Sequence, residues 1–161
     1  MMDPSLPVAI LYAALALMLG FVPRKTAAAS LLVAGSLTFA VSQIDVPPTM
    51  AIPAITGCWV GVLVLAVWIY WPKRLGNSLA IPLAAAAGII AGIVVGSAAT
   101  PFNPYPLVAA VLLVVPASVA VERGYAIAPR VVASWLVAVS LLAALLPFVV
   151  SHPGYVPDHR G

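Results

Sequence analysis

Charged side chains are scarce in this chain, and the interiors of its long apolar runs contain none. Asp, Glu, Lys and Arg make up 7% of the 161 residues, while hydrophobic residues make up 64%. A soluble domain carries about 25% charged residues. A chain this apolar is stable only where lipid surrounds most of it, and in lipid the backbone must pair within helices or a closed barrel. A barrel would alternate apolar and polar residues, which these continuous runs do not do. We therefore predict an all-α, polytopic transmembrane helical bundle.

The lack of ionisable residues inside the runs also bears on function. Proton relays, voltage sensors and intramembrane proteases depend on ionisable groups at membrane depth, and a serine nucleophile needs a base to activate it. We therefore expect no catalytic residues, no cofactor and a non-enzymatic role. Cys58 is the single cysteine, which excludes a disulfide framework or cysteine metal cluster within one chain. The sequence has no basic patch with interleaved aromatic residues, so nothing in it indicates binding to nucleic acid.

Six apolar runs are long enough to be considered as membrane spans. They cover approximately residues 6–23, 26–44, 52–71, 79–100, 102–121 and 131–150, and a polar tail follows at 151–161. Asp3 precedes the first run and bases follow it, the reverse of a secretory signal, so we expect this span to be retained. The fifth run is the shortest in strictly apolar residues, and Pro116 is expected to kink it.

The bases predict how the chain is oriented. They gather in three alternate loops, as Arg24 with Lys25, Lys73 with Arg74, and Arg123 with Arg130. The remaining loops contain Asp45 and no base. Because cytoplasmic loops are enriched in Lys and Arg, these three loops are predicted to be cytoplasmic and both termini to lie on the outer side. We expect a plasma membrane location, in a bacterial inner membrane.

Small residues recur every fourth position in the fourth span. This seam consists of Ala84, Gly88, Gly92, Gly96 and Thr100, and the third span has a shorter one at Gly57 and Gly61. Small residues at this spacing let helices approach closely in lipid, where van der Waals contact holds a bundle together. Both seams are predicted to be helix-packing surfaces, available to another membrane subunit or a second copy.

Hydroxyl groups in the second span allow two interpretations. Ser30, Thr38 and Ser42, with Gln43 and Asn103 near the outer face, are candidates to line a path for a small neutral solute. Such hydroxyls more often bond the carbonyl four residues back or a neighbouring helix. Packing is therefore favoured over a path.

The outer face collects the remaining polar and aromatic candidates. A docking surface there would consist of Asp45, Phe102, Tyr105, His152, Tyr155 and His159. Asp45 with the two histidines could also gather a metal ion, but histidines without fixed spacing are weak evidence for a ligand set. We expect no metal site, and solvated loop residues are the simplest interpretation.

These features favour a membrane-embedded subunit of a larger complex that transports solutes or handles energy. The alternative is a self-contained homo-oligomeric transporter or channel for a small neutral or weakly polar solute. Both hypotheses place the chain in a lipid bilayer, with other membrane subunits or its own copies as partners.

Overall fold

The computed structural model describes residues 5–70, 79–98, 103–125 and 127–149, and these ranges are almost entirely helical. The elements are α1 (Ser5–Leu19), α2 (Arg24–Ser42), the short 3-10 helix η1 (Pro48–Met50), α3 (Ala51–Tyr70), α4 (Ala80–Ser97), α5 (Tyr105–Glu122) and α6 (Ile127–Val149). Five of the helices in these ranges are long and apolar enough to cross a membrane, α1 being shorter. The chain is therefore an all-helical bundle of the kind found in multi-pass membrane proteins.

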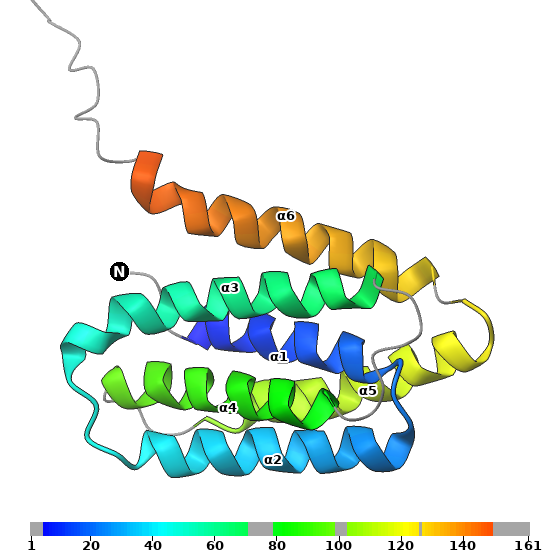
Figure 1. The fold of residues 1–161 in the computed structure, drawn as a ribbon, viewed down its shortest axis with the longest axis horizontal. Coiled ribbons are helices and arrows are strands. Elements are labelled where there is room, and N and C mark those ends of the chain that lie inside the picture. Colours follow the sequence, from blue (N-terminus) through cyan, green and yellow to red (C-terminus); the bar gives the residue numbers. More distant parts are fainter. Residues whose placement is uncertain (1–4, 71–78, 99–102, 126, 150–161) are drawn as a thin grey trace, which may run out of the picture.

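Consecutive helices run in opposite directions (Figure 1). α6 lies on the outside of α3, and α2 lies on the opposite side of the bundle against α4. α5 packs mainly against α1, and it contacts α2 and α6 much less. This arrangement leaves α2 and α5 as neighbours that touch over only a small area.

α1 is the central element of the bundle. It contacts α3, α4, α5 and α6, and most of its residues are buried, with Leu11, Leu15 and Leu19 each at 1% exposure or less. Its 15 residues reach about 22 Å, short of the hydrocarbon thickness of roughly 30 Å. The shortest α-helix described is thus the one that protein, rather than lipid, surrounds most completely.

The helix bounds differ from the predicted spans by one to four residues, and three of these differences have a clear local cause. α1 stops at Leu19 instead of 23, because Gly20 begins a turn and Pro23 has no backbone N–H to donate. α5 begins at Tyr105 with Pro106 in its first turn, where the missing N–H costs little. α6 begins at Ile127 instead of 131, since Pro129 is tolerated there for the same reason.

The described bases lie at one end of the bundle. Arg24 begins α2 and forms an ion pair with Glu122 at the end of α5, while the Tyr70 hydroxyl at the end of α3 donates to the Arg130 carbonyl oxygen on α6, at 2.5 Å. Arg24, Glu122, Arg130 and Tyr70 therefore share what we call the basic end. Asp45 lies at the opposite end, after α2.

Candidate functional site

A buried polar cluster joins three helices in the interior. The Thr38 Oγ1 on α2 lies 2.6 Å from the Tyr12 hydroxyl of α1, 3.0 Å from the Gly88 carbonyl oxygen of α4 and 2.9 Å from the Ala34 carbonyl oxygen of its own helix. A hydroxyl has one proton, so when Thr38 donates to a carbonyl oxygen, Tyr12 donates to Thr38. Tyr12 and Thr38 are both almost fully buried. The polar atoms of this cluster are therefore satisfied by one another.

Two other buried hydroxyls have no hydrogen-bond partner among the described residues. Ser30 on α2 and Ser140 on α6 are both fully buried. Ser140 lies on the side of α6 that carries the buried residues Ala133 and Leu136, in a helix that packs mainly against α3. Each hydroxyl is small enough to be accommodated within a helix contact.

The small residues of α4 are occupied by contacts within the chain. A Cβ placed on Gly88 would lie 2.5 Å from the Ala34 carbonyl oxygen, and one on Gly92 would lie 2.6 Å from Val41 Cβ. Ala84 is buried, and Gly96 lies next to Val46 in the segment after α2. α2 therefore covers the central part of this seam, which leaves no room there for a helix of another chain.

The shorter seam of α3 also faces its own chain. A Cβ on Gly61 would meet the Leu11 side chain of α1 at 3.0 Å, and one on Gly57 would meet Ile90 of α4 at 3.6 Å. Both glycines also line a cavity of about 270 Å³ between α3 and α4, together with residues such as Val60 and Leu83. The approach of α3 is looser than that of α2 to α4.

Two large hollows lie between α2 and α5. One has a volume of about 460 Å³, and its walls include Ala27, Ala28 and Leu31 of α2 and Val111, Val115 and Val119 of α5. A second, of about 480 Å³, shares Ala28, Leu31 and Val111 with the first and extends to Ser36 and Leu107. Because the two hollows share wall residues, we treat them as one continuous groove, the α2/α5 groove. It is open at the side of the bundle, where Ala28, Val111 and Val115 are exposed.

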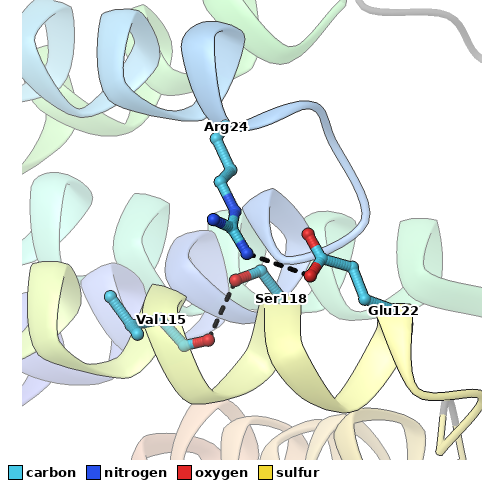
Figure 2. Close-up of polar contacts among 4 residues, drawn as sticks. All are labelled: Arg24, Val115, Ser118 and Glu122. Atoms are coloured by element: carbon cyan, nitrogen blue, oxygen red, sulfur yellow. Dashed lines mark hydrogen bonds and ion pairs between the residues drawn. The ribbon is translucent and has the colours of Figure 1, made fainter.

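Contacts between α2 and α5 mark both ends of the α2/α5 groove. At one end the Leu107 side chain lies directly over Gly35, 2.8 Å from where a Cβ would be. At the other, Arg24 donates to the Glu122 carboxylate at 2.9 Å (Figure 2). One turn before Glu122, the Ser118 hydroxyl donates to the Val115 carbonyl oxygen, so this polar group in the groove wall is satisfied by its own helix. Arg24 and Glu122 remain largely exposed, with side chains 72% and 56% accessible.

The candidate solute-path residues have separate surroundings in the structure. Ser30 and Thr38 are buried in helix contacts, and the Ser42 hydroxyl bonds the Phe39 carbonyl oxygen. Gln43 is exposed, and Asn103 Oδ1 accepts from the Tyr105 N–H at 3.0 Å, which fixes the start of α5. None of these five residues lines any of the three cavities described above.

Only two of the candidate docking residues can be placed. Asp45 is exposed, and Tyr105 is 76% exposed at the start of α5. Phe102, His152, Tyr155 and His159, like Thr100 of the α4 seam, lie outside the described residues. Within the described ranges, no three His, Cys, Asp or Glu side chains form a group that could hold a metal ion.

Sequence reasoning missed three side chains that make contacts between helices. Tyr12 was hidden in a uniformly apolar run, although a lone hydroxylic aromatic inside a span is itself a signal for an interhelical hydrogen bond. Glu122 adjoins Arg123 in a predicted loop and Tyr70 ends an apolar run, so the sequence around neither residue indicates a contact between helices. The pairing of Arg24 with Glu122 joins residues 98 positions apart, which hydropathy along the chain does not indicate.

Comparison with known proteins gives no relative from which a role could be transferred. No family model, no curated protein and no solved structure matches this chain. The interpretation of the site therefore rests on its own geometry.

Proposed function

We propose that the protein is a non-enzymatic, multi-pass subunit of a larger membrane complex that transports solutes or handles energy. The observation that carries this proposal is that Thr38, one of the hydroxyls of the candidate path, already makes its hydrogen bonds within the bundle. Its oxygen is engaged by Tyr12 and by backbone carbonyl groups of α2 and α4. A solute crossing past Thr38 would have to break these bonds, so the polar chemistry of transport is better supplied by a partner.

The surface proposed to meet the partner is the outer side of α6. The central seam of α4 is covered by α2, whereas α6 packs mainly against α3 and exposes Trp135 and Leu142 by 69% and 66%. In lipid, an apolar face contacts acyl chains or another helix equally well. A helix attached along one side is therefore the natural place for a second subunit.

The proposed topology has six spans, with the basic end in the cytoplasm and both termini on the outer side of a bacterial plasma membrane. Arg24, Lys25, Arg123 and Arg130 at one end and Asp45 at the other support this orientation through the positive-inside rule. α1 is short for a span, but neighbouring helices surround it, so most of its side chains contact protein instead of lipid.

Native mass spectrometry of the protein, extracted gently from its own membrane, tests the proposal. We expect it to be bound to other polypeptides at fixed stoichiometry. If it is found only as copies of itself, and the purified protein alone takes up a neutral solute in liposomes, the subunit proposal is wrong and the homo-oligomeric transporter takes its place.

A further inference from the structure

We propose that the α2/α5 groove binds an acyl chain of an anionic glycerophospholipid, whose phosphate group lies beside Arg24. This inference requires the bundle to lie in a membrane, but it does not depend on the proposed role as a complex subunit. Three features of the groove support it, namely its shape, its depth and the charge at its mouth.

The groove exists because its two walls are held by other helices. α2 is drawn close to α4 at Gly88 and Gly92, and α5 is drawn close to α1, where a Cβ on Gly20 would lie 2.8 Å from Ala117 Cβ. The space left between α2 and α5 is lined almost entirely by apolar side chains. An empty hollow forfeits dispersion contacts, and an apolar one does not hold water. In a bilayer, an acyl chain is the apolar molecule available to fill it.

The length of the groove matches one leaflet. From Arg24 to Ser36 on α2, or from Leu107 to Val119 on α5, the walls run about 18 Å. Half of the hydrocarbon thickness is about 15 Å. Leu107 closes the groove over Gly35 at the end away from Arg24, so the hollow has about the length of one acyl chain and is shorter than a helix that crosses the bilayer.

The mouth of the groove lies at the basic end and carries an excess of positive charge. Among the residues that the structure describes at this end, Arg24, Lys25 and Arg123 outnumber the one acid, Glu122, and all four residues are exposed. A guanidinium group has five N–H donors in a planar fork, and the contact with Glu122 joins one Arg24 nitrogen to one carboxylate oxygen. The remaining donors suit a phosphate group, which arginine binds with strong, charge-assisted hydrogen bonds. This charge favours an anionic lipid over a zwitterionic one.

The test is native mass spectrometry of the whole protein in detergent micelles with added phosphatidylglycerol or phosphatidylcholine of identical acyl chains. We expect one phosphatidylglycerol to be retained per chain, about five-fold more than phosphatidylcholine, which corresponds to about 1 kcal/mol for a base near a headgroup. Equal retention of the two lipids by the wild-type protein would overturn the selection of an anionic headgroup.

Charge variants separate recognition of the phosphate from a purely structural ion pair. Arg24→Gln is expected to reduce phosphatidylglycerol retention to the phosphatidylcholine level, while Glu122→Gln raises it by freeing Arg24. Arg130→Gln removes a base from the same end on α6, away from the groove, and serves as the matched control with no change. If Arg24→Gln and Glu122→Gln lower retention equally, the ion pair only holds the walls together and the phosphate assignment is wrong.

A filled groove tests the position of the acyl chain. Ala28 is exposed and lines both hollows, so Ala28→Phe fills the space without entering a helix contact. We expect it to lower retention of both lipids several-fold. Ala29→Phe, at the next exposed position and outside the groove walls, is the control and leaves retention unchanged. Undiminished retention in Ala28→Phe would show that the lipid binds elsewhere.

Discussion

Thr38 is the residue on which the interior of this bundle depends most clearly. Its hydroxyl is shared among α1, α2 and α4 through Tyr12, Ala34 and Gly88. In lipid, an unsatisfied polar group has no water to turn to, so the mutual satisfaction of these groups favours one specific arrangement of the three helices. The cluster therefore specifies the arrangement as well as adding to its stability.

Thr38→Val is expected to destabilise the protein by about 0.6 to 1.7 kcal/mol, from the average to the largest value measured for interhelical hydrogen bonds in a membrane protein. Valine keeps the shape and removes the hydroxyl, leaving Tyr12 and the Gly88 carbonyl group without this partner. The free energy of unfolding in mixed micelles measures the effect. Thr56→Val is the matched control, because the Thr56 hydroxyl is exposed and bonds only the Ile52 carbonyl oxygen of its own helix. Equal losses in the two variants would contradict the role of Thr38.

At the scale of single residues, the sequence predicts which hydroxyl groups are candidates but not the groups to which they hydrogen-bond. The spacing of Ser30, Thr38 and Ser42 predicts one face of a helix, yet the three hydroxyls have different surroundings in the structure. Ser30 is buried without a partner, Thr38 is fully engaged, and Ser42 bonds within its own helix. The difference depends on which atoms of α1 and α4 lie opposite, and those atoms come from distant parts of the chain.

Among the elements, α2 and α4 form the closest helix pair described. The pair is close because Gly88 and Gly92 present no side chain where Ala34, Thr38 and Val41 of α2 approach. The Gly88 carbonyl oxygen also accepts a hydrogen bond from Thr38. The close approach of α2 to α4 and the hydrogen bond from Thr38 to Gly88 therefore depend on each other.

Gly88→Ala is expected to destabilise the bundle by about 1 to 3 kcal/mol, the usual cost of overpacking. The added methyl group would lie 2.5 Å from the Ala34 carbonyl oxygen and 2.9 Å from Ala34 Cα, and backbone atoms cannot rotate away. Gly57→Ala is the comparison, because its methyl group would meet only Ile90 Cγ2 at 3.6 Å, an ordinary contact. Thermal unfolding followed by circular dichroism in detergent distinguishes the two. A Gly88→Ala protein as stable as Gly57→Ala would show that α2 and α4 do not pack this closely.

Helix positions were far more predictable than helix partners. Apolar length locates each helix to within a few residues, and the errors occur where Gly20, Pro106 and Pro129 set the ends. Most of these helices are apolar on all sides, so they lack the polar face that would indicate which side points outward. The sequence thus predicts that α1 exists, but it does not predict that α1 lies at the centre.

For the whole molecule, one end carries the bases and the other does not. The three basic loops alternate along the chain, and the antiparallel order of the helices brings the described ones to the same end (Figure 1). The mouth of the α2/α5 groove opens at this end. The proposed orientation and the proposed lipid binding therefore both depend on the bases at this end of the bundle, and neither requires a soluble domain.

Single-cysteine labelling on a Cys58→Ala background tests the proposed orientation. Cys58 is fully buried, so its replacement with alanine removes background reactivity at modest structural cost. Thr49→Cys, in exposed η1, is expected to react with an impermeant reagent on intact cells. Tyr125→Cys, at an exposed position in the turn after α5, is expected to react only after the membrane is permeabilised. The opposite pattern would invert the topology.

The central position of α1 also affects how the protein is made. Of the described helices α1 is synthesised first, yet α3, α4, α5 and α6, which enclose it, all follow it along the chain. Its contacts with α5 and α6 span most of the chain length, and such non-local contacts form slowly. Until they form, a 15-residue helix must be held in the membrane without its final neighbours. The last two helices are therefore the step at which the bundle closes, and a ribosome stalled before them leaves the core of the protein exposed to lipid.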